Sequence, residues 1–224
     1  MKGMNKMKEK LISVILAVLF SQSYVEASLI ERVFTNMPDE YYLFQSSEQR
    51  SELLKSHKRN DTTGVRNRFG GKSYILDLHE ENEFLRIRNT NISTLEMKIW
   101  TMNSGEPILG VNIITCSSAC DSDIAFFNHK WEHVNKLFPS LQLTDFLNWT
   151  QLFNDNKSID EILAAFDIVF FHYSFSKTST DIEAELHLDK NKSEEEIAQL
   201  MPYLNTKLIL RWNGAQFVII TPEQ

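Results

Sequence analysis

The strongest constraint on the fold is an alternation of side-chain character in the middle of the chain. Along "LEMKIW", residues 95–100, Leu95, Met97 and Ile99 occupy every second position, and Glu96 and Lys98 lie between them. Successive side chains of a strand point to opposite faces, so this period of two is typical of an extended segment. The pattern predicts an antiparallel sheet with one buried face.

Similar strand patterns continue on both sides of this segment. Short polar turns such as "NSGEP" separate them, which favours an antiparallel meander. The predicted strands of this meander are residues 73–79, 83–89, 93–102, 108–116 and 123–131. Residues 28–58 have a helical pattern instead, and a polar loop with three glycines leads from that helical region to the first strand.

The C-terminal part of the chain repeats the succession of helices and strands. Helices are predicted at residues 143–153, 158–166 and 194–201, and strands at residues 167–175, 181–189, 207–212 and 216–221. Asn213-Gly214 is the strongest hairpin signal, and Ser158 with Glu161 has the spacing of a capping box, as Ser193 has with Glu196. We therefore predict an α+β protein with antiparallel sheets and with helices before and between them. It would have two lobes, residues 28–140 and 141–224.

Residues 1–27 have the features of a secretory signal peptide. Four lysines precede the apolar run "LISVILAVLF", and "VEA" provides a cleavage site after Ala27. The apolar run is too short to span a bilayer, so we expect a periplasmic or secreted mature chain without a transmembrane segment. Cleavage would remove four basic and two acidic residues and leave a net charge of about −9, which argues against nucleic acid as a partner.

Cys116 and Cys120 are the only cysteines, and three interpretations are open for them. Neighbouring thiols normally oxidise after export, and a disulfide bond would then join the ends of two strands. A redox pair would instead require Cys-x-x-Cys at the start of a helix. A metal site is the third interpretation, because thiolates bind Cu(I) and His129 and His133 follow closely. We adopt the disulfide.

The segment "HKWEH", residues 129–133, matches the His-x-x-Glu-His order of inverted zinc peptidases. On a helix, His129 and His133 would bind zinc and Glu132 would act as the base. Here the segment follows a predicted strand, whose continuation would place both histidines on the same sheet face as Trp131. Because of this strand context, a metal-dependent hydrolase or metal-handling protein that uses this segment and the cysteine pair is only our alternative hypothesis for the function.

The leading hypothesis is an exported, non-catalytic binding or interaction module. The sequence contains no convincing catalytic set, so we predict no catalytic residue and no cofactor. The partner would be a protein or a small molecule. Exposed aromatic side chains at Trp100, Trp131 and Trp149 would form the interaction surface.

Four short segments carry a resemblance to a known family: "NMPDEYY", "NRFGGKS", "STLEMKIW" and "TCSSACDSDIAFF". Through them the mature chain resembles an uncharacterised family of exported proteins from Bacteroidales, the domain of unknown function 3256. The resemblance includes both cysteines and the Asp-Ser that follows them, whereas the family pattern around Trp131 lacks the flanking histidines. It implies a periplasmic or surface-facing protein and implies nothing about activity.

Overall fold

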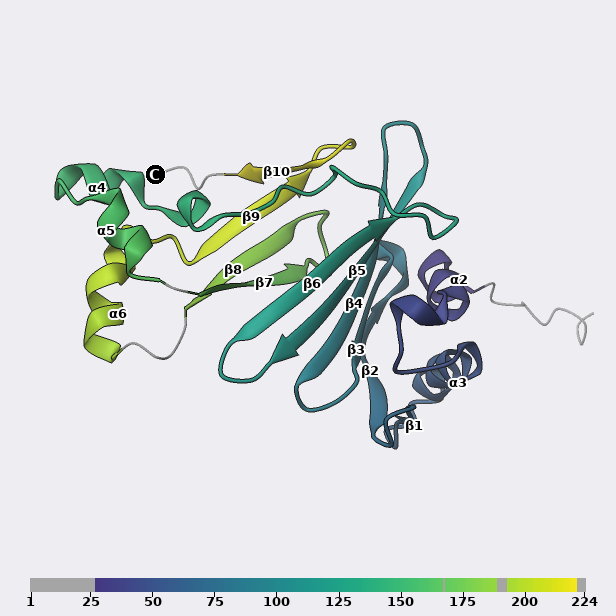
Figure 1. The fold of residues 1–224 in the computed structure, drawn as a ribbon. Coiled ribbons are helices and arrows are strands. Elements are labelled where there is room, and N and C mark those ends of the chain that lie inside the picture. The colour runs from purple at the N-terminus through teal and green to yellow at the C-terminus, as the bar shows by residue number, and fades with distance from the viewer. Residues whose placement is uncertain (1–26, 167, 189–192, 221–224) are drawn as a thin grey trace, which may run out of the picture.

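A computed structural model describes residues 27–166, 168–188 and 193–220 as an α+β protein with two antiparallel sheets (Figure 1). The six-stranded sheet has the order β1-β2-β3-β4-β5-β6, and the four-stranded sheet has the order β10-β9-β8-β7. The strands are β1 (Val65–Arg66), β2 (Lys72–His79), β3 (Phe84–Arg88), β4 (Ser93–Thr101), β5 (Pro107–Cys116), β6 (Cys120–Phe127), β7 (Val169–Phe175), β8 (Ile182–Leu188), β9 (Lys207–Trp212) and β10 (Phe217–Ile220). The predicted fold class is confirmed.

The helices lie before and between the sheets. They are α2 (Leu29–Asn36), α3 (Ser47–Lys58), α4 (Trp149–Asn154), α5 (Ile159–Ala164) and α6 (Glu194–Leu200), with short 3-10 turns η1 (Asp39–Tyr41), η2 (Glu80–Asn82), η3 (Leu143–Phe146) and η4 (Met201–Tyr203). The predicted capping box of Ser193 and Glu196 is formed at the start of α6. The box of Ser158 and Glu161 is not formed, and Glu161 pairs with Lys157 instead.

Strand β4 is buried on both faces. Leu95 and Met97 on one face pack against α2 and α3, while Glu96, Lys98 and Trp100 on the other face are only 1–3 % exposed. Figure 1 shows the reason, because α2 and α3 lie on one side of the six-stranded sheet and β7 to β10 lie on the other. The prediction of a single buried face is therefore wrong for this strand.

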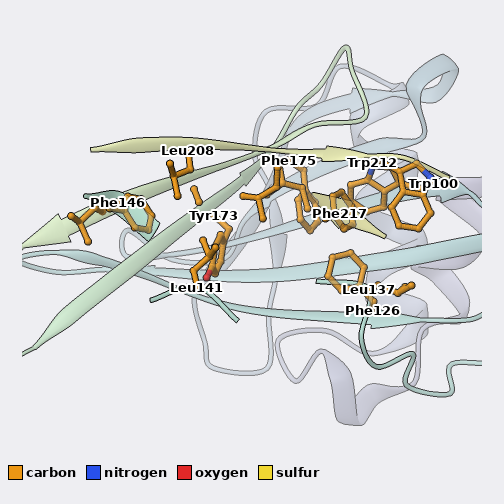
Figure 2. Close-up of a cluster of buried hydrophobic side chains, with 14 of the residues drawn as sticks. Trp100, Phe126, Leu137, Leu141, Phe146, Tyr173, Phe175, Leu208, Trp212 and Phe217 are labelled. Carbon is orange, nitrogen blue, oxygen red and sulfur yellow. The ribbon is translucent and has the colours of Figure 1, made fainter. Parts of the chain in front are cut away.

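The larger core cluster lies between the two sheets and is rich in aromatic rings (Figure 2). The ring of Trp100 meets Phe175 edge-on at 5.1 Å and Phe217 at 5.2 Å, and Phe126 lies 5.3 Å from Phe217. Such edge-to-face contacts add to the stabilisation that comes from burial alone. The cluster combines side chains from both predicted segments, 28–140 and 141–224, and the division into two lobes stays a prediction.

Strand β6 is displaced relative to its predicted bounds. It begins at Cys120 and ends at Phe127, four residues before the predicted end. The chain turns there because the side-chain oxygen of Asn128 accepts hydrogen bonds from the backbone N–H groups of Lys130 and Glu132, at 2.8 and 3.1 Å. Trp131 within this turn has a φ of 63°, which a strand could not accommodate.

The described part of the chain contains no helix that is long and apolar enough to cross a membrane. The predicted signal peptide, residues 1–27, lies outside the described residues except for Ala27.

Candidate functional site

The two cysteines form a disulfide bond between the end of β5 and the start of β6. Their sulfur atoms are 2.06 Å apart, and the two residues are directly paired in the ladder of these strands. The predicted bond is confirmed. Because bonded sulfurs are not thiolates, Cys116 and Cys120 are not metal ligands in this state.

The segment His129 to His133 forms a turn rather than a helix. Its histidines therefore do not share a helical face, which is the arrangement that the zinc-peptidase hypothesis requires. His133 packs its ring 4.5 Å from Phe127 and forms an isolated bridge with that residue, while Glu132 accepts a hydrogen bond from the side chain of Asn128 at 2.8 Å. Nothing in this geometry favours the hydrolase.

The three tryptophans proposed as an interaction surface lie in three different environments. Trp100 is a core residue whose indole N–H donates to the carbonyl of Thr180 at 2.9 Å, so it cannot serve as a surface contact. Trp131 is partly buried against the ring of Tyr41. Trp149 alone is largely exposed, at 45 %, and lies beside the exposed Phe153. The three residues therefore do not form one aromatic surface.

A group of basic side chains lies at the β1 end of the six-stranded sheet. We call Arg66, Lys72, Tyr74 and Arg88 the basic edge. Arg66 pairs with Lys72 across β1 and β2, and Tyr74 pairs with Arg88 across β2 and β3. Since directly paired residues share a sheet face, as do residues two apart on one strand, all four side chains project on the same side.

The cations of the basic edge have no carboxylate partner within the described part of the chain. Arg88 stacks on Tyr74, with its guanidinium carbon 4.7 Å from the ring centroid, and Lys72 donates to the carbonyl oxygen of Thr63 at 2.8 Å. Arg66 and Lys72 are like charges placed directly opposite each other, which is unfavourable in a sheet. An anion bound between them would remove this repulsion.

Two cavities adjoin the basic edge and share Tyr74 and Arg88. One of about 470 Å³ is lined by Lys72, Asn89 and Asn91, and the other, of about 440 Å³, lies towards α3. Volumes of this size are typical of sites for small molecules.

The second cavity contributes an acid of its own, Asp61. The backbone N–H of Thr63 donates to the carboxylate of Asp61 and lowers the pKa of that group. This charge gives the cavity towards α3 a mixed character, whereas no acidic side chain lines the cavity beside Lys72.

A separate cluster on β7 and β8 has the side chains of a metal site. His172, Glu185 and His187 have nitrogen and oxygen atoms that all lie within 4.8 Å of one another. Partial burial, the largest influence, raises the pKa of Glu185, but Lys207 and the two histidines outweigh it and leave the pKa below its usual value. The sequence alone does not bring these three residues together, because the turn between β7 and β8 does not fix the register of the two strands.

The chain is an α+β protein with two open antiparallel sheets. Helices cover the outer face of the larger sheet, and the basic edge with its two cavities lies at one end of it. Residues 22–217 match the family described as "Protein of unknown function (DUF3256)", and the chain belongs to this family. The resemblance found in the sequence is therefore confirmed.

The fold also occurs in a solved structure, described as a domain of an uncharacterized protein from Porphyromonas gingivalis W83. The TM-score is 0.67 at 20 % sequence identity, over 87 % of this chain and 99 % of that chain. A likeness at this identity establishes the shared fold alone. No curated protein matches the sequence.

Proposed function

We propose that this protein is an exported, non-catalytic binding module that holds an anionic ligand at the basic edge. The observation that carries the proposal is the set of three cations, Arg66, Lys72 and Arg88, on one sheet face without a carboxylate partner in the described residues. The chain as a whole has an excess of acidic residues, so this local group of positive charges favours an anionic partner.

The chemistry of these side chains defines the ligand class. A guanidinium group matches a carboxylate or phosphate through two parallel hydrogen bonds, and a lysine supplies a compact charge for the same anion. Stacking on Tyr74 holds the Arg88 guanidinium in place, so that less conformational freedom is lost on binding. We infer a small ligand, or the end of a chain, that carries one carboxylate or phosphate group.

The side chains around the cavity beside Lys72 support binding rather than catalysis. Asn89 and Asn91 add amide groups, which can hydrogen-bond to hydroxyl or carbonyl groups of a ligand. This cavity is lined by no histidine, cysteine or carboxylate that could act as a nucleophile or as a general base. The arrangement therefore suits recognition of a charged group and its polar neighbours.

Export forms the second part of the proposal. The predicted signal peptide and the Cys116–Cys120 disulfide both support an oxidising compartment, the periplasm or the exterior. Expression of the full chain in a Gram-negative host, followed by sequencing of the mature N-terminus, tests this part. We expect the mature protein to begin at Ser28, and a cytoplasmic chain with an intact N-terminus would contradict it.

Ligand binding is tested by titration calorimetry with two probes, inorganic phosphate and the monosaccharide galacturonic acid, which carries a single carboxylate. The two probes distinguish phosphate from carboxylate recognition. We expect one of them to bind, and we expect Lys72→Gln and Arg88→Gln each to weaken binding by roughly tenfold, which corresponds to about 1.4 kcal/mol.

A matched control is Lys130→Gln, which removes one positive charge from the exposed turn after β6, the strand at the opposite edge of the sheet. This control should leave the affinity unchanged. Absence of binding for both probes, or an equal loss in the control, would contradict a site at the basic edge. Galactose, the neutral counterpart of galacturonic acid, should not bind.

A further inference from the structure

We propose that His172, Glu185 and His187 form a binding site for a divalent transition-metal ion, zinc or copper. The site lies on the β7–β8 hairpin and involves none of the residues of the basic edge. It also differs from the "HKWEH" segment, whose turn conformation removes the arrangement that a metal would need.

The register of the hairpin assembles the cluster. His172 on β7 is directly opposite Glu185 on β8, and His187 follows Glu185 two positions later on the same strand. Residues directly opposite and residues two apart project on one face, so the three side chains converge. Strands hold their side chains more rigidly than a loop does, which reduces the ordering that a metal ion must impose.

The distances suit a small ion. A carboxylate oxygen of Glu185 lies 3.5 Å from Nδ1 of His172 and 3.5 Å from Nε2 of His187. Tetrahedral zinc with bonds of about 2.0–2.1 Å holds neighbouring ligand atoms about 3.3 Å apart. An ion between these three atoms would therefore need only small side-chain movements.

The ligand set leaves a coordination position open. Two histidines and one glutamate supply three ligands, and a tetrahedral ion would take a water molecule as its fourth. The three side chains are 23–34 % exposed, so an ion can enter from solvent. Imidazole and carboxylate together suit zinc and copper better than the hard cations calcium and magnesium.

Two features of the surroundings limit the affinity. The first is Lys207, whose ammonium nitrogen lies 4.0 Å from the second oxygen of Glu185 and repels a bound cation. The second is a hydrogen bond of 3.0 Å from the backbone N–H of Cys120 to Nδ1 of His187. That bond requires an unprotonated Nδ1, so a neutral ring carries its proton on Nε2.

Metal binding at Nε2 of His187 must therefore shift the tautomer. The proton leaves Nε2 and is carried by Nδ1, so the ring stays neutral and releases no proton overall. Nδ1–H and the N–H of Cys120 would then face each other as two donors, and the hydrogen bond between them is lost. Occupation of the site is thus coupled to the disulfide-bonded turn that connects β5 and β6.

The experiment uses protein prepared without a histidine tag and titrated with Zn²⁺ by calorimetry. We expect one ion per chain, and at least a tenfold loss of affinity in His172→Asn and in Glu185→Gln. Lys207→Gln should bind zinc more tightly than the parent, because it removes the repelling charge. Partial unfolding of a variant could not produce such a gain in affinity. The matched control is the double variant His129→Asn/His133→Asn, which should bind as the parent does.

A second readout follows the backbone amide of Cys120 by NMR. At a Zn²⁺ concentration that saturates the parent protein, this resonance should be fully shifted in the parent and clearly less shifted in His172→Asn. The proposal is overturned if the parent binds no zinc, if the control loses binding as His172→Asn does, or if the Cys120 amide is unaffected at saturation.

Discussion

The carboxylate of Glu96 on β4 accepts a hydrogen bond of 2.8 Å from the backbone N–H of Phe175 on β7. Its other oxygen accepts from the guanidinium of Arg86, also at 2.8 Å. A residue 1 % exposed thus connects two sheets through bonds that its charge strengthens. Asp77, Arg86, Glu96 and Asn112 lie side by side across β2, β3, β4 and β5, so Glu96 belongs to a polar row on the face that β7 covers.

We expect Glu96→Gln to destabilise the protein by about 1–3 kcal/mol, because the variant loses a buried charge-assisted contact and Arg86 keeps only its longer ion pair with Asp77, at 3.7 Å. Urea unfolding should show a lower midpoint with an unchanged slope. Glu106→Gln, at an exposed position between β4 and β5, is the matched control and should change stability by less than about 0.5 kcal/mol. Equal midpoints for the two variants would mean that the buried pair contributes nothing.

Gly110 on β5 makes room for the indole of Trp100. A Cβ atom added at this position would lie 2.5 Å from the Trp100 ring and 3.2 Å from Phe175. Because the core between the sheets is closely packed, we expect Gly110→Ala to cost roughly 1–3 kcal/mol. In Gly71→Ala the added atom meets only ordinary contacts with Asn67, so this control should leave thermal stability near that of the parent.

The strands of the meander could be predicted because alternation is a local property. The alternation in "LEMKIW" predicts an extended strand regardless of what packs on either face, and β4 confirms this strand. The sequence could not show that Glu96 and Lys98 are buried. That depends on the second sheet, which β7 to β10 form more than 60 residues later in the chain. Charged residues at alternate positions normally predict a solvent face.

The candidate sites were harder to predict from the sequence than the fold. The Cys116–Cys120 bond was predicted because both partners are close in sequence. The cluster of His172, Glu185 and His187 could not be predicted, since it depends on a register that the loop "SKTSTD" does not specify. The basic edge likewise requires the pairing of β1 with β2 and of β2 with β3, which composition alone does not reveal.

The disulfide closes a very short loop, and its contribution to stability is correspondingly small. Loop-closure entropy gives about 2 kcal/mol for a bond between residues four apart. The double variant Cys116→Ser/Cys120→Ser should therefore remain folded and unfold at a lower urea concentration. Thiol titration of the native parent should detect no free thiol. Two reactive thiols per native chain, or failure of the variant to fold, would contradict this account.

Tyr173 should make the protein unstable at alkaline pH. Burial, followed by the charges of Asp121 and Asp145, raises the pKa of Tyr173 to about 12, from 10.0. Between these two values the unfolded chain has already released the proton that the folded chain retains, so stability falls as the pH rises. The loss is about 1.4 kcal/mol for each pH unit, and below pH 10 the contribution of Tyr173 is fully present.

The measurement is the free energy of unfolding at pH 9 and at pH 11 for the parent and for Tyr173→Phe. Burial also raises the pKa of Tyr42 and lowers that of Lys98, with opposite effects on the slope, but both residues are present in each protein and cancel in the comparison. We expect the parent to lose about 1.4 kcal/mol more than Tyr173→Phe over this interval, since only the second of the two pH units lies above the pKa of the unfolded tyrosine. Parallel losses in the two proteins would show that Tyr173 titrates normally.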